Sequence, residues 1–163
     1  MNQLFCDGGV VGKNPSEIGG TWAFRLLTDG IVTCEKSGHI TPEDAQMPVV
    51  TNNLTEMIAL IKGLQNTPTD WIGTVCSDSQ VTLGRVFQGW KWNGIPLWMH
   101  KQFQQIVKEH TNWDKIDYVR LDGHPTKEQL KSGIGKRGGP VSIHNQWCDK
   151  ACGKQAELLY IPF

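Results

Sequence analysis

The sequence predicts one α/β domain on a five-stranded mixed sheet, with three antiparallel strands, then parallel strands, and helices on its faces. An Asp-Gly pair at positions 29 and 30 separates two strand-like runs, which is typical of a hairpin. Further along, an amphipathic helix lies between two strand patterns, and such a crossover returns the chain parallel to the earlier sheet. The 163 residues are enough for one hydrophobic core, so we expect a single domain over residues 1–163.

The first half of the chain supplies the antiparallel strands and a long helix. A short buried strand is expected at 3–7, followed by two strands within 19–40 on either side of the Asp-Gly turn. In the segment 51–67, apolar residues recur at the spacing of one helix face, after the polar start Thr51-Asn52-Asn53. The apolar positions of this predicted helix are Leu54, Met57, Ile58, Ile61 and Leu64.

The second half alternates strands with helices, as a parallel sheet requires. We expect a strand within 71–78, helices over 79–87 and 96–110, and another strand at 115–121. A final helix is expected to begin near Asn145.

Composition narrows the class of protein. The chain is 39% apolar and 20% charged with a formal net charge of 0, which is typical of a folded domain rather than a disordered or strongly basic one. No signal peptide and no apolar run long enough to cross a membrane is evident. The five scattered cysteines are expected to be reduced, which predicts a cytoplasmic protein. We also predict that the protein is a monomer and does not bind membranes.

Four acids stand where a sheet edge would bring them together. Asp7 ends the first predicted strand, Asp78 ends the fourth, and Glu56 and Asp149 lie early in two helices. Ligands bind outside the carboxyl ends of strands in open sheets, and clustered carboxylates need cations to neutralise them. Hard oxygen ligands favour Mg²⁺, with Mn²⁺ as an alternative, and two such ions suit phosphodiester hydrolysis. Each acid alone also has a structural explanation, as a turn residue, a capping residue or a favourable charge at a helix start.

Five ordered segments resemble the ribonuclease H type 1 family. They are "CDGGVVGKNPSEIGGTWAF", "TNNLTEMIAL", "CSDSQ", "QGWKWNG", and the pair "DGH" and "HNQWCD", which together span nearly the whole chain. The resemblance implies an RNase H-like fold and an endonuclease that hydrolyses the RNA strand of RNA–DNA hybrids, leaving 5′-phosphate and 3′-hydroxyl ends. It also implies that Asp7, Glu56, Asp78 and Asp149 bind two metal ions.

The resemblance further implies a catalytic histidine and a set of substrate-binding residues. His124 follows Gly123 after the last strand, as the family histidine does, and His144 is its rival because it adjoins the helix of Asp149. Amide side chains suit recognition of the RNA 2′-hydroxyl, which is both donor and acceptor. The predicted substrate-binding residues are Gly8, Gly9, Asn14, Asn52, Asn53, Gln80, Trp90, Lys91, Lys136, Arg137 and Asn145.

Two segments depart from the family pattern. In the family, the tryptophan-lysine segment forms a substrate-binding handle that often includes an extra helix rich in lysine. Here the handle, residues 89–103, is short and carries only Lys91 and Lys101 as cations. Conversely, residues 125–143 form an enlarged basic loop rich in glycine and lysine, expected to be either a flexible linker or a phosphate-binding segment. We expect this loop to replace part of the missing basic handle.

Other functions fit the sequence less well. A nuclease of related fold that acts on DNA, such as a resolvase or exonuclease, and a non-catalytic hybrid-binding module both remain alternatives. The "GIGKRG" motif within 133–138 matches a dinucleotide-binding pattern, but it does not follow a strand or open a helix. The same motif lacks the residues of a Walker A loop, so we expect no nucleotide cradle there.

Overall fold

A computed structural model describes residues 1–159 and confirms the predicted five-stranded mixed sheet, with strand order β3-β2-β1-β4-β5. Strands β1, β2 and β3 pair antiparallel, while β4 runs parallel to β1 and β5 runs parallel to β4. The elements are β1 Gln3–Val10, β2 Gly20–Thr28, β3 Ile31–Ile40, α1 Pro42–Ala45, α2 Asn52–Gln65, β4 Thr74–Ser77, α3 Gln80–Phe87, α4 Leu97–Glu109, the 3₁₀ helix η1 Trp113–Lys115, β5 Asp117–Arg120, α5 Lys127–Ser132 and α6 Ile143–Leu159.

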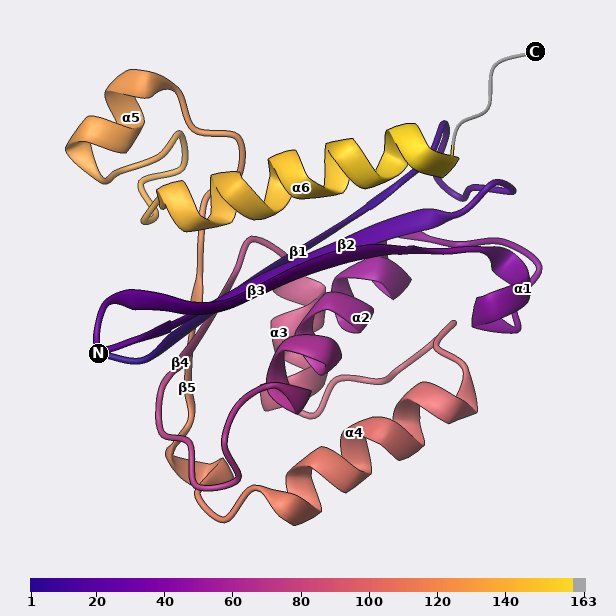
Figure 1. The fold of residues 1–163 in the computed structure, drawn as a ribbon, viewed down its shortest axis with the longest axis horizontal. Coiled ribbons are helices and arrows are strands. Elements are labelled where there is room, and N and C mark those ends of the chain that lie inside the picture. The colour runs from indigo at the N-terminus through magenta and orange to yellow at the C-terminus, as the bar shows by residue number, and fades with distance from the viewer. Residues whose placement is uncertain (160–163) are drawn as a thin grey trace.

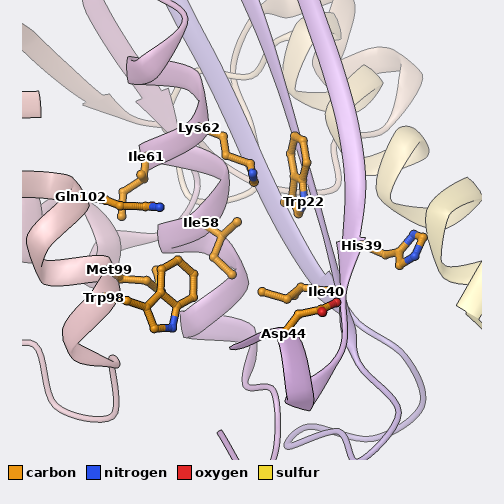
Figure 2. A pocket seen from close by; sticks show the side chains of 10 residues that line it. All are labelled: Trp22, His39, Ile40, Asp44, Ile58, Ile61, Lys62, Trp98, Met99 and Gln102. Carbon is orange, nitrogen blue, oxygen red and sulfur yellow. The ribbon is translucent and has the colours of Figure 1, made fainter. Parts of the chain in front are cut away.

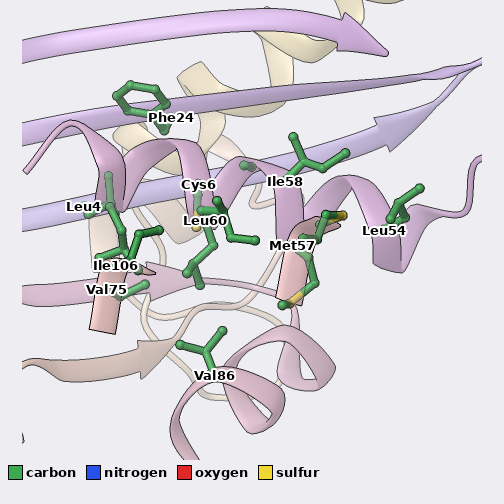
Figure 3. Close-up of a cluster of buried hydrophobic side chains, with 14 of the residues drawn as sticks. Leu4, Cys6, Phe24, Leu54, Met57, Ile58, Leu60, Val75, Val86 and Ile106 are labelled. Carbon is green, nitrogen blue, oxygen red and sulfur yellow. The ribbon is translucent and has the colours of Figure 1, made fainter. Parts of the chain in front are cut away.

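The helices form a layer on each face of the sheet (Figure 1). Helix α6 crosses one face against β1, β2 and β3, whereas α2 packs on the other face and is backed by α3 and α4. Because successive side chains of a strand point to opposite faces, β1 supplies both cores. Leu4 and Cys6 join the larger cluster with α2 (Figure 3), while Phe5 joins a smaller cluster with Cys148 and Cys152 beneath α6.

Several bounds differ from the predicted ones. Strand β1 extends to Val10 rather than ending at Asp7, because Gly8 and Gly9 pair with β2. Strands β4 and β5 are each four residues long, shorter than predicted. Helices α1, η1 and α5 were not among the predicted elements.

The predicted loop 125–143 contains helix α5. Thr126 caps this helix, accepting a hydrogen bond from the Gln129 N–H at 3.2 Å, while the Gln129 side chain accepts from the Thr126 N–H at 3.0 Å. Gly133, in the left-handed conformation, ends the helix. In Figure 1, α5 lies beside the N-terminal end of α6. Across residues 1–159, none of the helices has the length and apolarity that crossing a lipid bilayer would demand.

Candidate active site

Strand register places Asp7 level with Asp78. Phe5 of β1 pairs with Cys76 of β4 in parallel register. Asp7 and Asp78 lie two residues further along the chain from this pair, so they are neighbours too. Asp7 lies within β1, and Asp78 follows the last residue of β4. Asp78 is not the N-cap of α3, because the Ser79 hydroxyl caps that helix. The sheet therefore holds these two carboxylates side by side.

Helix α2 brings Glu56 to the same place because it packs closely on β1. A Cβ atom on Gly8 would lie 2.6 Å from backbone atoms of Thr55 and Glu56, so only glycine permits this approach. Thr51 caps the helix through the N–H of Leu54 at 3.1 Å, which places Glu56 in the second turn. Glu56 is thus a buried helix residue and not the partner in a capping box.

The three carboxylates form a tight cluster. One oxygen from each of Asp7, Glu56 and Asp78 lies within 4.8 Å of the others. Asp7 and Glu56 are 5% and 4% exposed, so water solvates them poorly. Burial, together with the charge of Asp78, raises the pKa of Asp7 to about 8. Burial and the charge of Asp7 raise the pKa of Glu56 well above its usual value. Burial also raises the pKa of Asp78.

The cluster fits divalent cations. Glu56 Oε2 is buried and has no hydrogen-bond partner among residues 1–159. A buried polar atom of this kind is costly unless an ion or a water satisfies it. Carboxylate oxygens without nitrogen or sulfur ligands are the donor set that Mg²⁺ and Mn²⁺ prefer.

Helix α6 brings the fourth acid to the edge of the cluster. Asp149, in the second turn of α6, lines a cavity of about 230 Å³ with Asp78, His124 and Asn145. The Asp149 carboxylate lies 3.8 Å from His124 Nδ1, and both side chains are largely open to solvent. The amide side chain of Asn145, which lines the same cavity, lowers the pKa of Asp78 against the effect of burial. The four predicted acids therefore gather around one site.

The structure separates the two candidate histidines. His144 Nδ1 lies 3.2 Å from Arg25 Nη1, and its ring packs against Phe5 at a centroid distance of 5.1 Å. Burial and the nearby Arg25 charge lower the pKa of His144. His144 does not line the cavity of the acids, whereas His124 does. The contacts of His144 connect the start of α6 to the sheet.

The predicted amide residues surround the start of α2 and α3. Asn14 Oδ1 accepts a hydrogen bond from the Asn52 N–H at 3.0 Å, which connects the loop after β1 to the first turn of α2. Asn53 is exposed beside it, and Gln80 is the exposed first residue of α3. Gly9 lies in β1, where a Cβ atom would approach the Thr21 hydroxyl at 3.1 Å.

Arg85 of α3 holds the tryptophan-rich handle in place. Its guanidinium donates to the carbonyls of Lys91 and Asn93 at 3.1 and 2.9 Å. Trp90 is 41% exposed beside it, whereas the Trp92 indole donates to the Arg85 carbonyl at 3.0 Å. Trp90 and Lys91 are therefore available at the surface, and Trp92 has a packing role.

The enlarged segment 125–143 turns back toward the acids. Lys136 and Arg137 line a cavity of about 410 Å³ with Asp78, Asp122 and His124. Asp122 was not among the predicted site residues, although its carboxylate contacts this segment directly. Its position immediately before Gly123-His124 is the only sequence signal that could have indicated it.

A separate cavity of about 250 Å³ lies between the sheet and α4 (Figure 2). It is bordered by Trp22, Trp98 and Met99, with Lys62 4.7 Å above the Trp22 ring. None of the four acids lines it, so the carboxylate cluster and this apolar cavity are distinct.

Comparison with known proteins agrees with this geometry. A curated ribonuclease H from Rhodopirellula baltica is 26% identical over 153 residues, which cover 91% of this chain and 85% of the relative. Among solved structures, the N-terminal RNase H domain of a Mycobacterium tuberculosis protein is similar, with a TM-score of 0.63 and 18% identity, covering 97% of this chain and 94% of that one.

Two further solved structures share the fold. RNase H1 from Halobacterium salinarum has a TM-score of 0.63 and 17% identity, with 96% of this chain and 97% of that one covered. LC11-RNase H1, in complex with an RNA/DNA hybrid, has a TM-score of 0.57 and 19% identity, with 94% and 98% covered. The RNase H family model matches residues 2–157. This match over nearly the whole chain shows that the chain belongs to the RNase H family.

Proposed function

We propose that this chain is a metal-dependent endonuclease that cleaves the RNA strand of RNA–DNA hybrids by a two-metal mechanism. The observation that carries the proposal is the convergence of Asp7, Glu56 and Asp78 within 4.8 Å, with Asp149 bordering the same cavity. Membership of the RNase H family and the hybrid bound by a structural neighbour support the choice of substrate.

The four acids are proposed to hold two Mg²⁺ or Mn²⁺ ions. When bound, the ions would neutralise the carboxylates and stabilise charge on the attacking and leaving oxygens of the phosphodiester. The chain itself supplies fixed positions, because β1, α2 and β4 hold three of the acids on rigid elements. Asn145 lines the same cavity as Asp78 and favours the ionised form of this acid. The products are proposed to carry 5′-phosphate and 3′-hydroxyl ends.

His124 is proposed to move a proton at the edge of the site. It borders Asp78 and Asp149, and its side chain is 84% exposed, so it can exchange protons with water. An imidazole can act as a general acid or base, which suits transfer of a proton to a leaving 3′ oxygen.

The hybrid is proposed to lie across the polar residues around the cluster. Asn14, Asn52, Asn53 and Gln80 would meet the minor groove, where amides can both donate to and accept from a 2′-hydroxyl. Gly8 and Gly9 are proposed to allow close approach of the backbone, and Trp90 and Lys91 to contact the DNA strand.

We further propose a monomer in the cytoplasm. All acids of the site come from one chain, so no second subunit is needed to complete it. The five cysteines are unpaired, which supports a reducing compartment.

Incubation with labelled RNA–DNA, RNA–RNA and DNA–DNA duplexes, with Mg²⁺ or Mn²⁺ and with EDTA, tests this function. We expect cleavage of only the RNA in the hybrid, only with metal, to products whose 5′-phosphate permits ligation. Asp78→Asn should abolish cleavage, while Asp29→Asn, the same charge change on an exposed turn, should not. Cutting of DNA duplexes would favour a DNA nuclease, and hybrid binding without cleavage would favour a binding module.

A further inference from the structure

Asp122 closes a turn that lies far from it along the chain. It follows Leu121 directly after β5 and is 7% exposed. Its Oδ2 accepts hydrogen bonds from the N–H groups of Arg137 at 2.8 Å and Gly139 at 3.1 Å. Its own N–H donates to the Pro140 carbonyl at 2.9 Å. One buried carboxylate therefore satisfies two backbone donors that the turn leaves unpaired.

The turn itself has a defined shape. The Gly135 N–H donates to the Gly139 carbonyl at 2.8 Å, and an isolated bridge joins Ile134 to Pro140. A Cβ atom on Gly139 would lie 2.6 Å from Asp122 Oδ1, so the turn approaches this carboxylate as closely as glycine allows. Residues 134–140 are thus an anchored hairpin and not the flexible linker considered from composition.

Asp122, Gly123 and His124 connect this hairpin to the acids. Gly123 abuts Asp78, because a Cβ atom there would lie 2.8 Å from Asp78 Oδ2. His124 Nδ1 lies 3.8 Å from the Asp149 carboxylate. Three consecutive residues therefore contact the hairpin and two of the four acids.

The hairpin brings two cations to a cavity that one of the four acids also lines. Lys136 and Arg137 line the cavity of about 410 Å³ that Asp78 and His124 also line. Arg137 Nε lies 3.7 Å from Asp122 Oδ1, and within residues 1–159 no carboxylate lies within ion-pair distance of Lys136. A cavity lined by two cations, next to a carboxylate proposed to bind a metal ion, suits a phosphate of the nucleic acid backbone.

We infer that Asp122 is a positioning residue that holds Lys136 and Arg137 as a phosphate subsite next to the acidic cluster. This inference rests on the proposed hydrolysis of RNA–DNA hybrids and adds how the chain grips a phosphate beside the cleavage point. The subsite compensates for the short handle, where Lys91 and Lys101 are the only lysines.

Hybrid cleavage by the full chain at several salt concentrations tests the two cations first. Lys136→Ala with Arg137→Ala should raise KM about tenfold and lower the slope of log affinity against log salt by about 1–2, since two phosphate contacts are lost. Lys127→Ala with Lys131→Ala is the matched control, because it removes the same charge from α5, outside the cavity. The control should change KM by less than about twofold.

Variants of Asp122 then separate positioning from packing. Asp122→Ala removes the acceptor, so it should raise KM about as much as loss of both cations, and removing the cations in that background should add little. Asp122→Asn retains one oxygen that can accept from both N–H groups, so it should restore KM to within about threefold of the wild-type value. Circular dichroism verifies folding, and if Asp122→Ala fails to fold, Gly139→Ala tests the same anchor from the opposite side.

Unchanged KM and salt slope in folded Asp122→Ala or Gly139→Ala would overturn the positioning role. Equal effects of the control and the Lys136-Arg137 variant would overturn the subsite, since general charge would then explain binding. Absence of hybrid cleavage by the wild-type chain would instead overturn the proposed function itself. The two failures are therefore distinguishable in one set of assays.

Discussion

Asp7 is expected to destabilise the metal-free protein at neutral pH, and Asp7→Asn should relieve this. A solvated aspartate has a pKa of 3.8, whereas burial and the charge of Asp78 raise the pKa of Asp7 to about 8 in the folded chain. Between these values the folded chain holds a proton that the unfolded chain has lost. The free energy of unfolding therefore falls as pH rises from about 4 to about 8 and levels off above that.

The magnitude follows from the width of this window. Each pH unit costs about 1.4 kcal/mol, so the loss at pH 7 is on the order of 4 kcal/mol for a fully desolvated group. Water that enters around the ionised carboxylate screens part of it, so we expect about 2–4 kcal/mol. A domain is commonly stable by about 5–15 kcal/mol, so the effect is readily measurable. Asp7→Asn should regain this amount at pH 7 and almost nothing at pH 4.

Urea unfolding in EDTA at pH 4 to 8, followed by tryptophan fluorescence, measures the effect. Added Mg²⁺ should stabilise the wild-type protein, by about 2.7 kcal/mol at one hundred times its dissociation constant, and Asp7→Asn far less. Asp29→Asn, on the exposed hairpin, is the control of equal charge. A flat stability of the wild type from pH 5 to 8 in EDTA, or an equal gain in the control, would refute the reasoning.

Three further predictions concern packing and catalysis. Gly8→Ala should destabilise the fold by about 1–3 kcal/mol in urea unfolding, because its Cβ would meet the α2 backbone, while Gly153→Ala, in open space on α6, should not destabilise it. His124→Ala should lower kcat about 100-fold, and His144→Ala should instead lower the free energy of unfolding by about 1–2 kcal/mol with kcat retained; the reverse pattern would reassign the histidine. Trp98→Phe should lower stability by about 1 kcal/mol without affecting kcat, because its indole donates to the last carbonyl of α1 at 2.8 Å.

Short sequence patterns predicted the elements whose formation depends mainly on neighbouring residues. The apolar spacing of residues 54–64 predicted α2, and the Asp-Gly pair predicted the β2–β3 hairpin. The predicted end of β1 at Asp7 was wrong. Gly8 and Gly9 are poor strand formers by propensity, but pairing with β2 holds them in the strand. Such pairing depends on residues more than ten positions away, which no local pattern reports.

The site residues show the same contrast between what local patterns predict and what long-range contacts determine. The sequence placed Asp7 and Asp78 at the ends of neighbouring strands; the two do lie side by side through the parallel register, although β1 continues past Asp7. The Asp122 anchor escaped prediction because its partners, Arg137 and Gly139, lie 15 and 17 residues further along. The Thr126-Gln129 capping box was visible in the sequence, but the basic composition around it suggested a loop.

Burial separates Asp7 and Glu56 from Asp149, and these acids should respond differently to neutralisation. Asp7 and Glu56 are nearly inaccessible to water, whereas the Asp149 side chain is 51% exposed next to His124. Water already solvates the Asp149 charge, so Asp149→Asn should leave stability in EDTA nearly unchanged at pH 7 while it removes hybrid cleavage. Asp7→Asn should also remove cleavage but should stabilise the metal-free fold. Equal changes in the free energy of unfolding of the two variants would contradict this prediction, because burial would then make no difference between Asp7 and Asp149.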